Sequence, residues 1–266
     1  MEFLIEFPAL GRRDLRDLRL AIDQSFKRFS REYGEQLEAL FDPLLQFLIA
    51  FERLLQAMPW PLFIAIVCAL AWLASRSVRI VIGTAISFYL IGLFGMWQDT
   101  MSTVSMIAVS TLLCLSLGLP IGVLMSRSDR AQSIVTPILD VMQTIPSFVY
   151  LIPVVMLLGI GKVPGLIAVV IYAIPPIIRL TNLGIRLVDA EVLEAADAFG
   201  ASPWQRLTQV QIPLALPNIF AGVNQTIMMS LAMVVIASMI GVSGLGQPVL
   251  KAISNQYLAM GLLNGM

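Results

Sequence analysis

The 266-residue sequence contains no histidine and only two cysteines, Cys68 and Cys114, and charged residues make up just 13% of it. Without histidine, no imidazole is available as an acid, a base or a metal ligand. Both cysteines stand within apolar runs, which favours packed thiols over a disulfide or a redox pair. The formal net charge is zero, so the composition does not point to nucleic acid as a partner.

Hydrophobic residues dominate instead, at 58% of the sequence, and the mean hydropathy is +0.86. Because soluble domains usually carry about 25% charged residues, the chain is predicted to be an all-α integral membrane protein. Six apolar stretches are the candidate spans: 60–74, 78–96, 101–125, 134–160, 163–178 and 214–240. Prolines inside several of them kink helices, which predicts a kinked multi-helix bundle.

The N-terminal segment, residues 1–58, differs from the rest of the chain. Between residues 12 and 33, apolar side chains recur every three or four positions opposite a densely charged face, as in an amphipathic helix. After Pro43, the apolar stretch 44–58 is shorter than the ~20 residues that cross a bilayer. We expect an interfacial helix lying in the membrane plane, or alternatively a helix packed against the outside of the bundle.

Basic residues are distributed unevenly among the connections between spans. Arginines flank the connections that follow the first, third and fifth candidate spans, whereas the opposite side carries only Lys162 and Lys251 near span ends. The positive-inside rule places the arginine-bearing connections in the cytoplasm. The N-terminus and segment 1–58 are then expected outside.

The connection 182–213 is a polar insert between apolar spans. Each of its charges would cost about 3 kcal/mol or less at mid-bilayer, and together they exclude a span. Asp189 is suited to N-cap a first short helix and Gly200 to end it. Ser202 starts a second helix with a Ser-Pro-Trp-Gln capping box, and Pro213 is expected to end it. Two short helices hinged at a glycine suit docking into a groove on another protein.

This insert resembles the EAA loop of importer-type ABC permeases. The resemblance rests on Glu194-Ala195-Ala196, then Gly200 after three residues, then Val210-Gln211-Ile212-Pro213 after nine. It implies that the loop 186–213 docks on an ATPase subunit and transmits its closure to the membrane helices. The residues implied in this contact are Glu194, Ala195, Ala196, Asp197, Gly200 and Ser202.

The flanking sequence is similar to the permease subunit of the glycine betaine/proline betaine importer and its quaternary-amine relatives. Three segments carry this similarity: 138–165, 172–185 and 220–253. It implies a type I ABC importer transmembrane fold over 59–266, in the inner membrane, as a homodimer. It also implies two ATP-binding subunits and a periplasmic or extracellular solute-binding protein as partners. Such permeases continue into a further apolar helix after 259–266, so a further C-terminal span is expected.

No nucleotide site is expected in this chain. The glycine-rich stretches 159–162 and 241–251 lack the spacing of a phosphate loop and are more typical of helix-end turns. ATP and magnesium are therefore assigned to the partner ATPase, and the chain itself is predicted to be a transport subunit and not an enzyme.

Polar side chains inside the apolar spans are candidates for the translocation pathway. They are Gln143, Asn224 and Gln225; Asp140 lies near a span end, where water can solvate it. Hydrogen bonds between helices are the alternative role for these side chains. An ion- or proton-coupled secondary transporter would more often show charged relay residues or an inverted repeat. A permease for a different small solute and a membrane scaffold that anchors a cytosolic protein are further alternatives.

Overall fold

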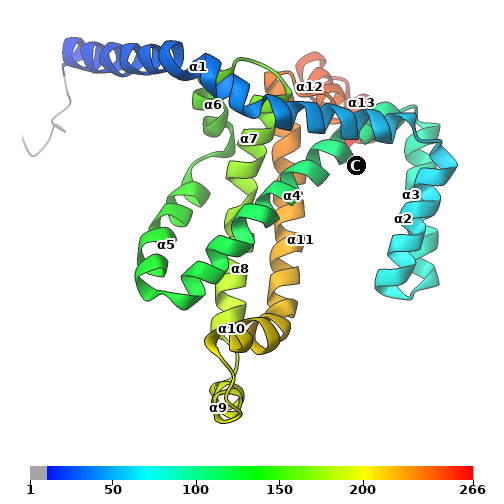
Figure 1. The fold of residues 1–266 in the computed structure, drawn as a ribbon. Helices are drawn as coiled ribbons and strands as arrows, with labels where there is room; N and C mark the ends of the chain where they lie inside the picture. Colours follow the sequence, from blue (N-terminus) through cyan, green and yellow to red (C-terminus); the bar gives the residue numbers. More distant parts are fainter. Residues whose placement is uncertain (1–10, 266) are drawn as a thin grey trace, which may run out of the picture.

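The computed structural model describes residues 11–265, apart from the side chains of Glu35 and Glu38. Within that range every regular element is helical, as the composition predicts (Figure 1). The α-helices are α1 (Arg12–Ala57), α2 (Trp60–Ser75), α3 (Val78–Leu93), α4 (Trp97–Arg127), α5 (Asp129–Thr144), α6 (Leu151–Leu158), α7 (Lys162–Ala173), α8 (Pro175–Arg186), α9 (Ala190–Ala198), α10 (Pro203–Gln205), α11 (Ile212–Ala237), α12 (Gly246–Asn255) and α13 (Leu258–Gly265). Shorter segments are the 3₁₀ helices η2 (Ser147–Tyr150) and η4 (Ser238–Ile240) and the π-helical turn η3 (Arg206–Gln211).

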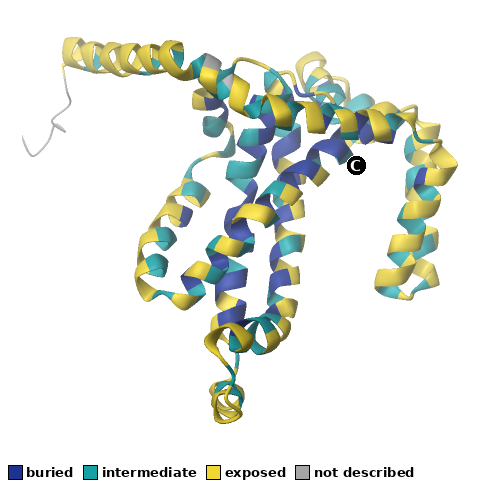
Figure 2. Cartoon of the chain, in the orientation of Figure 1, coloured by how far each residue is buried: buried dark blue, intermediate teal, exposed yellow. Residues whose placement is uncertain are grey.

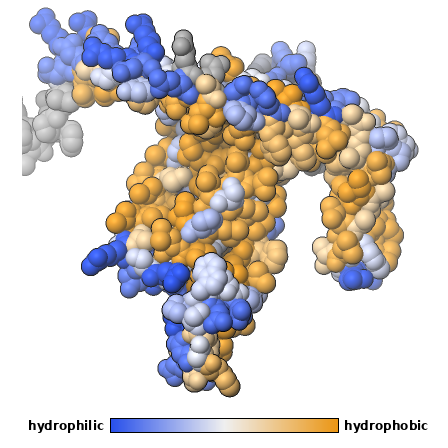
Figure 3. Space-filling view, viewed as in Figure 1, coloured by the Kyte–Doolittle hydropathy of each residue, from blue (hydrophilic) through white to orange (hydrophobic). Residues whose placement is uncertain are grey.

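The molecule has two distinct ends. Helix α1 crosses one end together with α12 and α13, and α9 lies at the opposite end, with α4, α7, α8 and α11 running between them (Figure 1). We refer to these as the α1 end and the α9 end. Figure 3 shows a mostly apolar surface between more polar ends. An apolar band between polar ends is what a bilayer requires of a protein that crosses it.

Helices α4, α8 and α11 form a closely packed core (Figure 2). A Cβ atom at Gly122 of α4 would lie 2.6 Å from the Thr181 Cβ atom and 2.8 Å from the Ile178 carbonyl oxygen of α8. A Cβ atom at Gly184 of α8 would lie 2.7 Å from the Asn218 Cβ atom of α11. Because lipid tails are as apolar as leucine, helices in a bilayer associate through such close approach at small residues.

Among the residues that the structure describes, three helices are long and apolar enough to cross a membrane: Trp97–Arg127, Lys162–Arg186 and Pro203–Ile240. They contain the candidate spans 101–125, 163–178 and 214–240. The candidate span 134–160 is instead a bent pair, in which Asp129–Thr144 and Ser147–Leu158 meet at 107°. The break falls at Pro146, because a proline pushes the preceding residue into extended geometry; Ile145 has φ −70° and ψ 130°.

Helices α2 and α3 form a hairpin that occupies the candidate spans 60–74 and 78–96 and stands apart from the core in Figure 1. Each helix has 16 residues, or about 24 Å, against a hydrocarbon thickness of about 30 Å. Phe63 is the one buried residue of the pair, and its ring packs edge-on against Phe88 and Trp97 at centroid distances of 5.4 and 5.6 Å. The count of six spans therefore stays a prediction.

Helix α1 runs without interruption for 46 residues, so the amphipathic stretch 12–33 and the apolar stretch 44–58 belong to one continuous helix that contains Pro43. A proline removes one hydrogen bond from a helix, and here that loss does not break the continuity of α1. The second half of α1 packs on the bundle, because Leu48, Glu52 and Leu55 are only 1%, 7% and 8% exposed. The buried face of α1 agrees with the alternative interpretation, a helix packed against the outside of the bundle. The part before Ser30, whose hydroxyl donates to the Met156 carbonyl at 2.8 Å, projects past the bundle (Figure 1).

A buried polar cluster fastens α1 to the core. The Glu52 carboxylate pairs with the Lys162 ammonium group at the start of α7 and accepts a hydrogen bond from the Ser102 hydroxyl of α4 at 2.8 Å. The Gln56 amide donates to the same hydroxyl at 3.1 Å. A buried carboxylate is stable only with such partners, so the cluster fixes the register of α1 over α4 and α7.

Candidate functional site

The polar insert folds into a capped helix at the α9 end. The Asp189 carboxylate accepts a hydrogen bond from the Glu191 backbone N–H at 3.0 Å, and Glu191 lies in the positive first turn of α9. Gly200 follows the helix with φ +78°, a left-handed conformation that glycine adopts without strain. Both predicted ends of the first helix are confirmed.

The second helix begins as predicted but does not end at Pro213. The Ser202 hydroxyl accepts from the Gln205 N–H at 3.3 Å, and the Gln205 side chain accepts from the Ser202 N–H at 2.8 Å, which completes the capping box. From there the helix continues through η3 into α11, in one run of 38 residues, Pro203–Ile240. The wider π-helical turn immediately before Pro213 leaves room for its ring, where a regular α-helix would place a carbonyl.

The insert exposes most of the residues implied in docking. Glu194, Ala195, Asp197, Gly200 and Ser202 are exposed, and Ala196 is half-buried (Figure 2). Two aromatic side chains accompany them: Phe199 is 93% exposed and Trp204 66%. The sequence analysis missed these two, although aromatic residues beside a helix-ending glycine in a polar insert are a signal for a contact surface.

An ion pair joins α9 to the start of the long helix. The Asp197 carboxylate lies 2.8 Å from the Arg206 guanidinium nitrogen. Below the pair, Leu207 is buried at 2% exposure and anchors η3 in the core cluster that also contains Ile185 and Ala215. The insert is therefore tied to the bundle through side chains as well as through the backbone.

A second polar cluster lies at the base of the insert. The Arg186 guanidinium group at the end of α8 pairs with Asp129 at 2.7 Å and donates to the Met125 carbonyl at 2.9 Å and to the Asn182 amide oxygen at 3.1 Å. It thereby fixes the end of α8 to the turn between α4 and α5. Asn182 lies four residues before Arg186, but Met125 and Asp129 are far from it in the sequence, and sequence reasoning did not find this cluster.

The polar residues expected on the pathway do not come together within the protomer. Gln143 lies exposed on α5, and Asn224 and Gln225 lie exposed on α11; α5 packs on α4, α7 and α8 and not along α11. The α11 face around Asn224 is apolar, with Phe220 64% and Met228 57% exposed. Asp140 forms an ion pair with Arg179 of α8.

The glycine-rich stretches form turns at the α1 end, as the sequence indicates. Gly159 and Gly161 have φ values of 74° and 146°, and Gly241 and Gly244 have 85° and 134°. Lys162 is engaged by Glu52. Over the residues that the structure describes, no group of three or more His, Cys, Asp or Glu side chains could hold a metal ion.

Comparisons with known proteins match these features to a family. The family model described as "Binding-protein-dependent transport system inner membrane component" matches residues 115–263, more than half of the chain. The chain belongs to this family. The matched range contains the whole loop 186–213, whereas α1, α2 and α3 precede it.

Two of the matching relatives show the range of this similarity. The glycine betaine/proline betaine transport system permease protein ProW of Escherichia coli (strain K12) is 48% identical over 84% of this chain. The glycine betaine transport system permease protein OpuAB of Bacillus subtilis (strain 168) is 40% identical over 92% of this chain and 86% of its own length. The chain spans 63% of the length of the E. coli relative.

A solved structure shares the fold. One chain of the MetNI methionine ABC transporter, in an inward-facing conformation, gives a TM-score of 0.56 at 22% identity, covering 65% of this chain and 87% of that chain. Likeness at this identity concerns the fold alone. It confirms the expected all-α, type I ABC importer transmembrane fold.

Proposed function

We propose that this chain is the membrane subunit of an ATP-driven importer and that α9 docks on a separate ATP-binding subunit. One observation carries the proposal: the capped and exposed helix α9 is joined to a membrane-length core helix by the Gly200 turn and the Asp197–Arg206 ion pair, and the exposed aromatic side chains Phe199 and Trp204 flank that turn. An exposed apolar side chain such as Phe199 is costly to leave in water and is typical of a protein contact. ATP and magnesium would bind to the partner, two copies of which would serve a permease homodimer.

The geometry supports a way to transmit force from the partner to the bundle. A displacement of α9 reaches η3 through the Asp197–Arg206 ion pair. It then passes into α11, because η3 continues into α11 without a loop. Helix α11 packs tightly on α8 at Gly184 and Gly222. Tightly packed helices shift between discrete arrangements and do not deform continuously, so a small displacement at α9 would switch the bundle between inward- and outward-open states.

The positions of the basic residues support a cytoplasmic α9 end. The turn from α4 to α5 carries Arg127 and Arg130, α8 ends at Arg186, and η3 begins at Arg206. At the α1 end, α7 begins with Lys162 and α12 contains Lys251, and the eight basic residues of α1 are matched by eight acidic ones on the same helix. By the positive-inside rule, the α1 end would face the periplasm or the exterior, where a solute-binding protein would dock.

The proposed solute is a small quaternary-amine osmolyte, with glycine betaine as the first candidate. The names of the E. coli and B. subtilis relatives described above both include glycine betaine. The exposed α11 face around Asn224 and Gln225 would line a pathway at the homodimer interface. A quaternary ammonium head is bulky and weakly hydrated, so a mildly polar and methionine-containing lining would let it pass without trapping it.

The test is reconstitution of the full chain in liposomes with its ATPase and solute-binding protein. We expect uptake of labelled glycine betaine that requires ATP on the α9 side, and an ATPase that copurifies with the chain. Phe199→Ala should release the ATPase, whereas Leu73→Ala, at a side chain that is 64% exposed on α2, should not. Uptake driven by an ion gradient without ATP would instead indicate a secondary transporter.

A further inference from the structure

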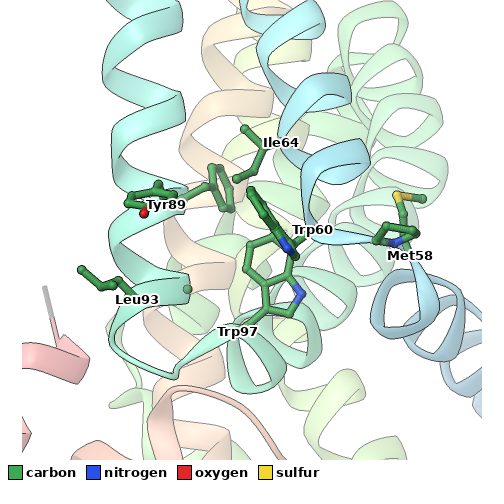
Figure 4. A pocket seen from close by; sticks show the side chains of 9 residues that line it. Met58, Trp60, Ile64, Tyr89, Leu93 and Trp97 are labelled. Atoms are coloured by element: carbon green, nitrogen blue, oxygen red, sulfur yellow. The ribbon is translucent and has the colours of Figure 1, made fainter.

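A cavity of about 530 Å³ lies where the end of α1 meets α2, α3 and the start of α4, away from the loop and from the pathway candidates. Figure 4 shows its lining: Trp60 and Ile64 come from α2, Tyr89 and Leu93 from α3, and Trp97 from α4. This volume lies within the range of about 300–1,000 Å³ that is typical of ligand pockets. The protein therefore has a second site-sized space that its proposed transport role does not use.

The lining selects the chemistry of a ligand. It contains no charged side chain, so a zwitterionic osmolyte would leave its carboxylate without a counter-charge in an apolar space. The polar groups present are neutral donors: the Tyr89 hydroxyl and the indole N–H groups of Trp60 and Trp97. Trp60 and Tyr89 are 55% and 57% exposed and Trp97 is half-buried, so the protein leaves these donors accessible from outside. An apolar chain with neutral acceptors at one end matches this set.

The position of the cavity indicates where such a ligand comes from. It opens among the outward-facing apolar side chains of the hairpin, where Leu62 and Leu93 are 51% and 66% exposed. It also lies at the level at which α1 crosses the bundle (Figure 1), and tryptophan and tyrosine gather at that depth of a bilayer. The compartment next to the opening is the lipid, and not water.

We propose that this cavity binds one phospholipid of the surrounding leaflet. An acyl chain fills the space between α2, α3 and α4, and the ester carbonyl oxygens accept hydrogen bonds from the Tyr89 hydroxyl and from an indole N–H. The lipid supplies packing that side chains do not provide, because Phe63 is the one buried residue of the hairpin within the described chain. This inference does not depend on the transported solute.

Gly92 offers a way to fill the cavity without disturbing the backbone. A Cβ atom there would meet only the Trp97 Cε3 atom, at 3.7 Å, an ordinary contact. Gly92→Leu therefore places a side chain in the space that the acyl chain would take. Gly83→Leu is the matched control, because it lies on the same helix, has nothing within 4 Å of its Cβ position and does not line the cavity.

The experiment measures quenching of Trp97 fluorescence by brominated acyl chains. The full chain, with Trp60, Trp72 and Trp204 each replaced by phenylalanine, is placed in nanodiscs of phosphatidylcholine that carries bromine on the acyl chain. Trp97 is half-buried, so the comparison of the two variants separates quenching by a chain inside the cavity from quenching by bulk lipid. We expect quenching at least twofold weaker for Gly92→Leu than for Gly83→Leu.

Three results would overturn the proposal. Equal quenching in the two variants would mean contact with bulk lipid only. Absence of quenching in the parent, together with a disulfide across the dimer from a Tyr89→Cys variant, would mean that a second copy fills the cavity. Relief of quenching by glycine betaine would mean a solute site. If Gly92→Leu does not elute as a folded protein, Ile64→Phe with Ile66→Phe as its control repeats the comparison.

Discussion

The α4–α8–α11 core and the α2–α3 hairpin are built on opposite principles. In the core, glycines bring helix backbones so close that a Cβ atom at Gly122 or Gly184 would overlap a neighbouring helix. In the hairpin, Gly83 has nothing within 4 Å of its Cβ position, and the contact with α4 is a small aromatic group around Phe63. The core is therefore stabilised by contacts between its own helices, whereas the hairpin depends on whatever surrounds it in the membrane.

This difference separates the parts of the molecule by role. A tightly packed core can carry a displacement from α9 along α11, because its helices cannot slip past one another by small steps. A loosely packed hairpin cannot carry such a displacement, but it can adapt to the bilayer. The family match begins at residue 115 and includes α8 and α11 but not the hairpin, which agrees with a shared moving core and a separate peripheral element.

The largest expected effect comes from a side chain forced into the core. Gly122→Leu would collide with the Ile178 carbonyl, a backbone atom that cannot rotate away, so α4 and α8 would have to separate. We expect a loss of about 3 kcal/mol of stability, seen as a lower midpoint of thermal unfolding in detergent. Gly83→Leu should change stability by about 0.5 kcal/mol or less. Equal losses of stability in the two variants would mean that the core is not packed more tightly than the hairpin.

The next effect tests whether α1 belongs to the core. Glu52→Leu leaves Lys162 and Ser102 without their partner, and we expect a loss of about 2 kcal/mol and faster proteolysis within α1. The double variant Glu52→Leu/Lys162→Met removes both charges together. It should be more stable than the sum of the two single changes predicts. Strict additivity would mean that the ion pair does not hold α1 in place.

A third variant separates backbone strain from coupling. Gly200→Val puts a β-branched residue at φ +78°, where space is open but the left-handed conformation costs about 1–2 kcal/mol. We expect the chain to remain inserted while ATP-dependent uptake falls more than tenfold. Gly95→Val is the control, because φ is +75° with open space but the residue lies between α3 and α4, away from the loop. Full uptake by the Gly200 variant would refute the assignment of the loop.

Local signals explain what the sequence could predict. The ends of α9 and the start of α10 follow from Asp189, Gly200 and Ser202, because a cap and its partners lie within a few residues of one another. The helix end expected at Pro213 was wrong, and α1 likewise continues through Pro43, because the effect of a proline depends on neighbouring structure. A π-helical turn before Pro213 could not be read from the sequence.

Long-range pairings explain what the sequence could not predict. The Glu52–Lys162 and Arg179–Asp140 pairs join residues 110 and 39 positions apart, and no local pattern selects such partners in a chain with charges at many span ends. The aromatic cavity could not be predicted for the same reason, because its residues Trp60, Tyr89 and Trp97 come from three different helices. The position of Asn224 on α11 was predictable, but its exposure in the protomer depends on which face packs against α8.

The smallest expected effect concerns that exposed face of α11, where the core meets the proposed pathway. Asn224→Leu should leave stability within about 0.5 kcal/mol, because the side chain is exposed and packs on nothing. If the face lines the pathway, the maximal uptake rate should fall about fivefold, which is about 1 kcal/mol in the barrier. The apparent affinity should stay constant, because the solute-binding protein sets it. Ser87→Leu, on the exposed surface of the hairpin, should change neither quantity. A large loss of apparent affinity at constant rate would instead reveal a specific solute site among the spans, and the core would then select the solute as well as move it.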